Sequence, residues 1–400
     1  MREGVGGEVG AGQVRRITLV LGAVMAIGPL AIDMYLPAMP RIAAEYGVDA
    51  ARVQHTLSAY LLGLTVGQLA FGPIADRYGR KGPLALGLLV FALACAGSAL
   101  VHTIDGFVAL RFLQALGGAS GMVVIRAIIR DRFDALQSAR VLSLMMLVMG
   151  VAPILAPLAG GWLMLHGAWQ WIFWFLAGFA VLCIALVLGL LEESHPPSRR
   201  SASLGAALAG FAPVARDLRF LGPALVFLSA FGMFFAYLAA SPFLFIQYYG
   251  IAPEAFGLYF AANAIGLIGV SQANRRLVLR HGPRRVLGWG VWSLAAGAAA
   301  LLAAAFADAP FWVVFALILL TIASVGLIAP NASAVAMEPF GRYAGGASSL
   351  LGATQSLFGV LTSIAVGWIS APGAIPMAGV MAACGAIAFG AYTFLVSPRR

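Results

Sequence analysis

Twelve apolar stretches, each long enough to cross a lipid bilayer as a helix, recur along the chain. Each runs for about 18 or more nearly uncharged residues, and about 20 helical residues cover the roughly 30 Å of a hydrocarbon core. The pattern predicts an all-α membrane protein with twelve transmembrane helices. The predicted spans are 17–39, 53–75, 83–103, 106–128, 141–165, 169–191, 221–246, 256–273, 286–306, 311–331, 344–369 and 374–396.

One long polar interruption divides these spans into two sets of six. It covers residues 192–219 and opens with Glu192 and Glu193. We therefore expect an N-terminal six-helix bundle over 1–191, a cytoplasmic linker over 192–219 and a C-terminal six-helix bundle over 220–400. Two equal sets suggest pseudo-symmetric halves. Residues 204–214 are mildly apolar and fit either a short interfacial helix or an ordinary linker.

Composition supports a membrane protein, and charge placement predicts its orientation. Of the 400 residues, 62% are hydrophobic and 10% are charged, against about 25% charged in soluble domains. The net charge is +10, and 22 of the 25 Lys and Arg residues lie in the terminal segments and in the loops after even-numbered spans. By the positive-inside rule, both termini face the cytoplasm. The positive charge therefore indicates topology and not a nucleic-acid partner.

The sequence gives little support to enzyme chemistry. Lys81 is the only lysine and follows Arg80, so no Gly-Lys-Ser/Thr phosphate loop exists. The five histidines are dispersed and form no metal-ligand cluster. We expect no metal and no cofactor.

The loop after the second span carries the most specific motif. Residues 72–84 read GPIADRYGRKGPL, which resembles the signature of the major facilitator superfamily, G-x-x-x-D-R-x-G-R-[RK]-x-x-[LI]. A generic basic loop would explain the cations but not the Gly-Asp-Gly spacing. The resemblance implies a conformational lock in which Asp76 meets the N-terminus of helix 11; pairing with Arg80 is the alternative. The motif residues are Gly72, Asp76, Arg77, Gly79, Arg80 and Lys81. A weaker echo follows span 8, in a loop that begins at Asn274.

Spans 4 and 5 resemble further motifs of that superfamily. Arg111 lies within span 4, and an intramembrane arginine is a functional candidate by default, although its side chain could instead reach the surface. Span 5 places small or helix-bending residues on one face and looks like the motif of proton-coupled exporters; close packing alone would also explain it. These residues are Gly150, Pro153, Pro157, Gly160 and Gly161.

Finer resemblance points to the Bcr/CflA family of bicyclomycin- and chloramphenicol-type drug exporters. It rests on residues 31–40, 241–243, 330–332 and 344–355. The resemblance implies exchange of drug for protons in the bacterial inner membrane and a cavity lined by helices 1, 4, 7 and 10. Candidate cavity residues are Tyr35, Gln114, Phe231, Phe234, Phe235, Tyr237, Asn331 and Gln355; the span 7 aromatics among them could equally face lipid.

Asp33 and Arg111 are the candidate proton-coupling residues. Asp33 lies eight residues before Arg41 and Arg111 six residues after Asp105, which at 1.5 Å per helical residue puts them about 12 Å and about 9 Å inside the same membrane face. Burial favours a protonated carboxyl and a nearby guanidinium favours a carboxylate, so small movements could load or release a proton. A static ion pair is the alternative.

These observations predict a proton-coupled antiporter that exports small amphipathic compounds by alternating access. Its partners would be protons, a small-molecule substrate and the lipid bilayer, and we expect a monomer. A superfamily transporter for one specific metabolite is the first alternative. A membrane-bound sensor or enzyme is the second, although its longest polar segment would be only 192–219.

Overall fold

A computed structural model describes residues 11–195 and 217–397, and it is helical nearly throughout. Its described part contains 12 helical segments long and apolar enough to cross a membrane, which confirms the predicted fold class. The first half comprises α1 (Ala11–Asp33), η1 (Leu36–Ala38), α2 (Met39–Tyr46), α3 (Ala50–Tyr78), α4 (Lys81–Leu100), α5 (Ile104–Arg132), α6 (Ala135–His166) and α7 (Gln170–Leu190). The mildly apolar segment 204–214 lies outside the described residues.

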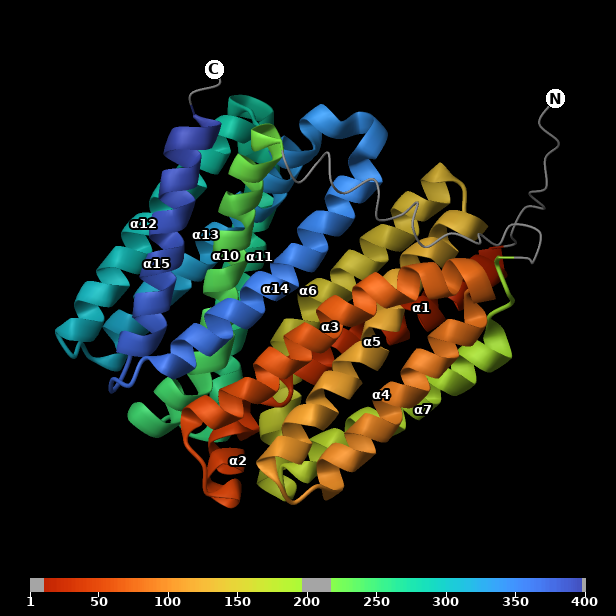
Figure 1. Cartoon of the computed structure of the whole chain (residues 1–400), viewed down its shortest axis with the longest axis horizontal. Coiled ribbons are helices and arrows are strands. Elements are labelled where there is room, and N and C mark those ends of the chain that lie inside the picture. Colours follow the sequence, from red (N-terminus) through yellow and green to blue (C-terminus); the bar gives the residue numbers. More distant parts are fainter. Residues whose placement is uncertain (1–10, 196–216, 398–400) are drawn as a thin grey trace.

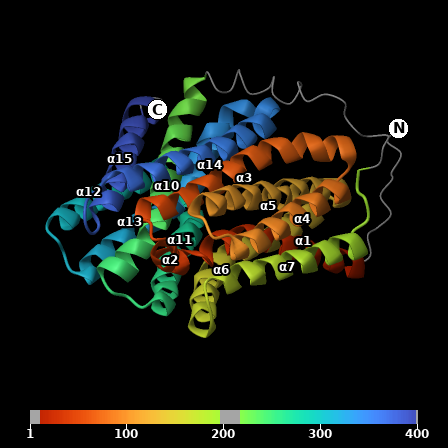
Figure 2. The same cartoon turned by 60° about the horizontal axis from the view of Figure 1, so that its bottom comes forward.

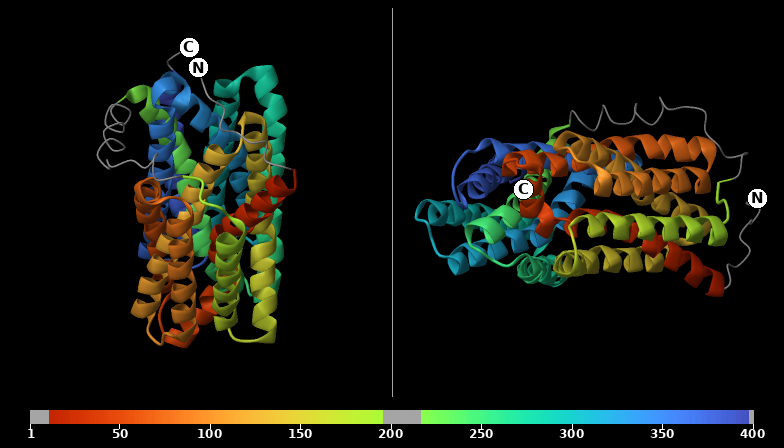
Figure 3. Two further views of the ribbon diagram at one scale, coloured as in Figure 1. Left: turned by 90° about the vertical axis from the view of Figure 1, so that its right-hand side faces the viewer. Right: turned by 90° about the horizontal axis from the view of Figure 1, so that it is seen from below.

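The second half repeats the arrangement with six further spans. It comprises α10 (Leu218–Pro242), η3 (Phe243–Tyr248), α11 (Pro253–His281), α12 (Pro283–Phe306), α13 (Phe311–Met337), η4 (Glu338–Tyr343), α14 (Ala344–Trp368), α15 (Ile375–Ala391) and η5 (Tyr392–Val396). Figures 1 and 2 show the two halves as separate bundles side by side, the first in red to yellow-green and the second in green to blue. Figure 3 shows that the helix axes within each bundle are roughly aligned.

Short polar side chains fix where several helices begin. Asp49, Thr103 and Asp134 accept hydrogen bonds from the backbone N–H of Arg52 (2.9 Å), Gly106 (3.3 Å) and Gln137 (2.7 Å) at the starts of α3, α5 and α6. The first N–H groups of a helix have no partner within it, and these side chains supply one. Helices α11 and α12 instead begin with proline, whose missing N–H costs nothing at that position.

The first predicted span, 17–39, is not one continuous helix. Helix α1 ends at Asp33, and η1 and α2 follow with a change of direction. The cause is Pro37, because a proline ring collides with the carbonyl four residues earlier, which here belongs to Asp33. The depth of Asp33 therefore cannot be calculated as an unbroken helical rise from Arg41.

The predicted loop at Asn274 is wrong. Helix α11 continues through Arg275 and Arg276 to His281 and ends at Gly282, which has φ +76°. Residues 274–281 contain neither Gly nor Pro, so nothing stops the helix where the apolar sequence ends. The weak echo of the loop motif is therefore mostly helical.

The two bundles contact each other mainly through two helix pairs, α6 with α11 and α3 with α14, and η1, α2 and α3 add smaller contacts with α10, η3 and α11. The closest approaches lie toward the end of the molecule that holds α2, here called the α2 end. There Ser58 Oγ donates to Ser363 Oγ at 3.0 Å, and a Cβ on Gly161 would lie 3.0 Å from the Glu254 backbone. The opposite end, here called the terminus end, holds Ala11 and Val396, and the ribbons diverge toward it (Figure 1). The described conformation is thus closed at the α2 end.

Candidate proton and substrate site

Arg111 on α5 is fully buried in the first bundle and is held between aromatic rings. Its guanidinium carbon lies 4.4 Å from the ring centres of both Tyr35 and Tyr60 and 5.8 Å from that of Phe173. The negative faces of such rings stabilise a cation by about 0.5–2 kcal/mol when water is excluded. Arg111 therefore does not reach the membrane surface, and the three rings form what we call the Arg111 cage.

The polar partners of Arg111 come from its own helix and from the end of α1. One terminal nitrogen donates to the Ala31 carbonyl at 3.1 Å and to Gln114 Oε1 at 2.5 Å. Gln114 in turn donates to Cys95 Sγ at 2.9 Å. Ala31 lies in the last turn of α1, where carbonyl groups run out of helical donors. The break in α1 thus supplies an acceptor for the buried arginine.

Two nitrogens of Arg111 have no hydrogen-bond partner among the described residues. These are Nε and the second terminal nitrogen, and the Tyr60 hydroxyl is equally unpaired. Within residues 11–195 and 217–397, no ion pair includes Arg111. A buried cation with unused donors is costly, so the cage is ready to receive a negative or hydrogen-bond-accepting group.

Asp33 closes α1 and is 5% exposed. In the described residues it has neither an ion-pair partner nor a hydrogen bond, so the structure does not join it to Arg111 directly. Its carboxyl group lies within electrostatic range of the hydroxyl groups of Tyr60 in the first bundle and Tyr237 in the second. Asp33 therefore lies between the halves, while Arg111 lies inside one of them.

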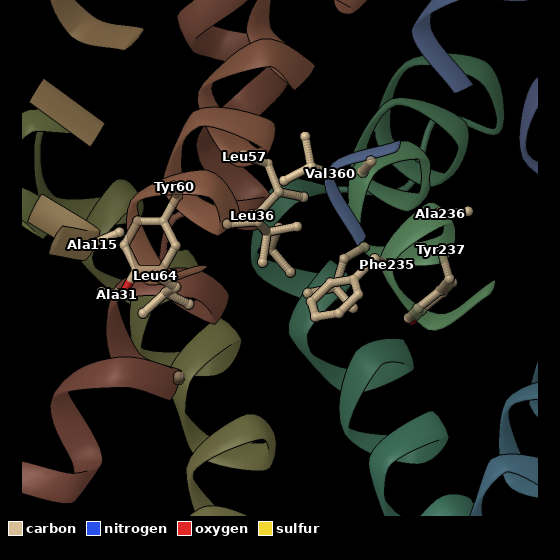
Figure 4. Close-up of a cluster of buried hydrophobic side chains, with 14 of the residues drawn as sticks. Ala31, Leu36, Leu57, Tyr60, Leu64, Ala115, Phe235, Ala236, Tyr237 and Val360 are labelled. Atoms are coloured by element: carbon tan, nitrogen blue, oxygen red, sulfur yellow. The ribbon is translucent and has the colours of Figure 1, made fainter. Parts of the chain in front are cut away.

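Figure 4 shows this region as a cluster of apolar side chains where the bundles meet. Tyr60 and Tyr237 lie on opposite sides of it, with Leu36 and Leu57 between them. Tyr35 lies deeper in the first bundle and is fully buried, with its hydroxyl bonded to Thr56 Oγ1 and its ring against Phe107. Tyr35 and Gln114 thus belong to the surroundings of Arg111 in this conformation and line no open cavity.

The predicted aromatics of span 7 separate into two groups. Phe234 and Tyr237 line a pocket of about 120 Å³ between α6, α10, α11 and α13. Phe231 packs against Phe227 with ring centres 4.7 Å apart and an interplanar angle of 49°, and the Phe235 ring packs against Gly359 of α14. The first group is therefore the one placed to contact a ligand in this pocket.

The same pocket receives two residues of the span 5 motif, Gly150 and Pro153, and we call it the α6–α11 pocket. Phe260 adds an aromatic ring to the walls of this pocket, and Asn263 adds a polar side chain. Since α6 belongs to the first bundle and the other walls to the second, the pocket lies across the boundary that must open and close during transport.

The remaining span 5 residues pack at the α2 end. A Cβ on Gly160 would collide with the Met34 carbonyl oxygen, and one on Gly161 would lie 3.2 Å from the Pro253 carbonyl oxygen. Pro157, three residues before Gly160, is buried. These glycines permit backbone contact with the break in α1 and with the start of α11.

The loop motif forms a charged cluster at the terminus end. Arg80 donates to Asp76 at 2.6 Å and to Asp131 at 2.9 Å. Gly79 has φ +92°, a conformation that favours glycine. A Cβ on Gly72 would lie 4.0 Å from the Val123 side chain, and the exposed Arg77 guanidinium lies over the Tyr78 ring. The alternative pairing of Asp76 with Arg80 is therefore what this conformation shows. Contact with the N-terminus of helix 11 stays a prediction.

Sequence reasoning missed the role of Glu193. Its carboxylate accepts from the backbone N–H groups of Arg80 at 2.8 Å and Lys81 at 3.1 Å, while Lys81 Nζ donates to the Leu188 carbonyl at 2.7 Å. Partial burial alone would raise the pKa of Glu193, but these donors, with those of His195 and Ser194, lower the pKa below its usual value. Glu193 thus caps α4 from the end of α7. The signal in the sequence was the pair Glu192 and Glu193 directly after an apolar span, which could have pointed to a helix cap.

Two candidate cavity residues lie elsewhere in the second bundle. Asn331 is buried and donates to Asn274 Oδ1 and to the Leu327 carbonyl, both at 2.7 Å, so it joins α13 to α11. Gln355 on α14 is partly exposed and has no hydrogen bond within the described residues. Neither lines the α6–α11 pocket.

Comparisons with known proteins agree with this architecture, and the chain belongs to the Major Facilitator Superfamily, whose model matches residues 21–363. Among its relatives, the chain is 34% identical to the uncharacterized MFS-type transporter YdgK of Bacillus subtilis over 93% of this chain and 94% of that one. It is 32% identical to the bicyclomycin resistance protein homolog of Haemophilus influenzae, covering 95% and 96%. It is also 32% identical to the multidrug resistance protein MdtL of Klebsiella pneumoniae, covering 85% of each. The predicted resemblance to the Bcr/CflA family is thereby confirmed.

Solved structures confirm the fold. A D-xylose-proton symporter superimposes with a TM-score of 0.75 at 15% identity, covering 96% of this chain and 97% of that one. The human organic anion transporter MFSD10 gives 0.68 at 17% identity, covering 96% and 99%. The chain is therefore a multi-pass transporter and not an enzyme.

Proposed function

We propose that the protein exports small amphipathic drugs or toxic compounds from the bacterial cytoplasm in exchange for protons. Relatives over most of its length carry the names bicyclomycin resistance protein homolog and multidrug resistance protein. The α6–α11 pocket is lined mainly by aromatic and aliphatic side chains, which suits apolar ligands with few fixed polar contacts.

Asp33 is the observation that carries the proton coupling. A carboxyl group that is buried between the halves without a hydrogen bond can exchange a proton when the halves move, because its surroundings then change. The Arg111 cage supports this role by keeping a positive charge inside the bundle to which α1 and Asp33 belong. Protonation of Asp33 would then favour one conformation and substrate in the α6–α11 pocket the opposite one. Exchange requires that the proton and the substrate exclude each other in this way.

The orientation we propose places both termini in the cytoplasm of a bacterial inner membrane. The basic loops support it through the positive-inside rule. In that orientation the α2 end faces outward and is closed, so the described conformation would be the one that takes substrate from the cytoplasm. Transport would proceed by rocking of one bundle against the other.

Transport by purified protein in proteoliposomes tests the proposal. The vesicles have an acidic interior, and the transporting molecules are those inserted with their cytoplasmic end on the outside. We expect these vesicles to accumulate bicyclomycin until a proton ionophore collapses the gradient. Sugars and nucleosides serve as comparison substrates in the same vesicles. Accumulation of one of those metabolites with no movement of drugs would contradict drug export and favour a specific metabolite transporter.

A further inference from the structure

Asn263 presents an unused hydrogen-bond acceptor in the α6–α11 pocket. It lies on α11, is 2% exposed and is one of the residues that line the pocket. Its Oδ1 atom is buried without a hydrogen-bond partner. Buried side-chain oxygens are normally paired, so this one calls for a donor that the described residues do not supply.

The orientation of the Asn263 amide follows from its neighbours. Its Nδ2 donates to the Tyr259 carbonyl at 3.0 Å and to the Tyr237 hydroxyl at 3.2 Å. Exchanging the nitrogen and oxygen would set Oδ1 against the Tyr259 carbonyl oxygen, where two acceptors would repel each other. The free acceptor is therefore a consequence of the fold.

The rest of the pocket defines what can bring the donor. Phe234, Tyr237 and Phe260 supply ring faces, and Gly150 and Pro153 leave room on the α6 side. The volume of about 120 Å³ is comparable with the roughly 150 Å³ of an engineered cavity that holds benzene. No acidic side chain lines the pocket, so a cationic group there would have no counter-charge in direct contact with it.

We propose that the α6–α11 pocket binds one ring that carries an uncharged hydrogen-bond donor, a hydroxyl or amide N–H, and that this donor bonds Asn263 Oδ1. Asn263 is then a specificity-determining residue: a buried acceptor left without its donor rejects analogues that lack one. Binding at this pocket is a property of the described conformation. That the bound molecule is also the transported one rests on the function proposed above.

Photolabelling with a matched pair of reagents tests this inference. The probes are 4-azidophenol, which carries a donor, and 4-azidoanisole, in which a methyl group replaces the donor hydrogen. Purified protein is illuminated with each, and labelled peptides are mapped by mass spectrometry. We expect 4-azidophenol to label the walls of the pocket on α6, α10 and α11 about fivefold more than 4-azidoanisole, the effect of one added hydrogen bond.

Two variants and a control make the result specific. Asn263→Leu keeps the side-chain size and should reduce labelling by 4-azidophenol to the level of 4-azidoanisole. Ala264→Phe fills the pocket and should reduce both, which keeps the inference testable if Asn263→Leu does not fold. Asn331→Leu removes another buried asparagine outside the pocket and should keep the fivefold difference.

Equal labelling of the unaltered protein by both reagents, or labelling confined to other helices, would overturn the proposal. The assay uses no proton gradient. Selective labelling of a protein that exports nothing would therefore support the binding pocket and contradict the proposed function. Export without selective labelling would support the proposed function and contradict the binding pocket.

Discussion

At the scale of residues, the site keeps its two opposite charges apart. Arg111 is held by ring faces, a carbonyl and an amide within one bundle, and two of its nitrogens stay without a hydrogen-bond partner among the described residues. Asp33, only two residues after the Ala31 carbonyl that accepts from Arg111, has no ion pair with Arg111 and lies within electrostatic range of both Tyr60 and Tyr237. A static ion pair that merely stabilises the first bundle is therefore not what this conformation contains.

Replacing Asp33 by Asn is the direct test of proton coupling. The amide has nearly the same shape but cannot release a proton, so we expect Asp33→Asn to fold and insert normally yet fail to accumulate drug against its gradient. The measurement is transport in proteoliposomes driven by a proton gradient alone. Exchange of labelled for unlabelled drug without a gradient serves as the control for binding and movement. Uphill accumulation by Asp33→Asn would remove Asp33 from the mechanism.

At the scale of elements, Glu193 connects the end of α7 to the start of α4. Because its pKa is lowered in the native protein, the carboxylate stabilises the fold at pH values above its ordinary value of 4.5. That stabilisation is lost as the pH falls through the lower native value. The cap also holds the backbone of Arg80, whose side chain joins Asp76 to Asp131.

The variant Glu193→Gln should therefore lower the melting temperature at pH 7, and this effect should shrink as the pH falls below 4.5 and the native carboxylate becomes protonated. Thermal unfolding in detergent across this range measures the difference. Glu192→Gln is the matched control, because Glu192 is 72% exposed and pairs only with Arg132. A destabilisation by Glu193→Gln that does not change with pH would show that the charge is irrelevant.

Helix α6 approaches the break in α1 through Gly160, where no side chain fits. Overpacking typically costs about 1–3 kcal/mol, so we expect Gly160→Leu to force α6 and α1 apart and to reduce transport more than protein level. Transport per unit of inserted protein is the measurement. Gly178→Leu on α7 makes the same change where a Cβ would meet nothing within 4 Å. Equal transport by the two variants would show that this contact is dispensable.

At the scale of the whole molecule, Ser58 and Ser363 join the bundles at the closed α2 end. Cysteines at both positions should form a disulfide, because the serine oxygens are already 3.0 Å apart and a disulfide needs only about 2.05 Å between sulfurs. Oxidation should stop transport and a reductant should restore it. Each single cysteine variant is the control. Full transport by cross-linked protein would mean that the α2 end does not open there.

The sequence predicted the architecture well because membrane spans need only local hydrophobicity and length. Charge placement and the loop motif likewise depend on short stretches. The details that sequence reasoning missed depend on tertiary contacts. The first span breaks after Asp33, the Tyr35 ring packs against the Arg111 guanidinium, and the Glu193 carboxylate accepts from the backbone N–H of Arg80, more than 100 residues away. The only sign of Asn263 in the sequence was a single amide side chain in an apolar span, which is a weak indication of a binding residue.

The isolation of Asp33 has a consequence for how the membrane potential acts on transport. Among the described residues it is the only buried Asp or Glu, so the proposed exchange through Asp33 would bring in one proton for each molecule exported. An uncharged ring compound leaving as one proton enters moves one net charge inward, and that is worth about 2.3 kcal/mol for each 100 mV. A compound with one positive charge, exchanged for one proton, moves none. Export of uncharged compounds should therefore draw on voltage as well as on the pH difference, and export of monovalent cations on the pH difference alone.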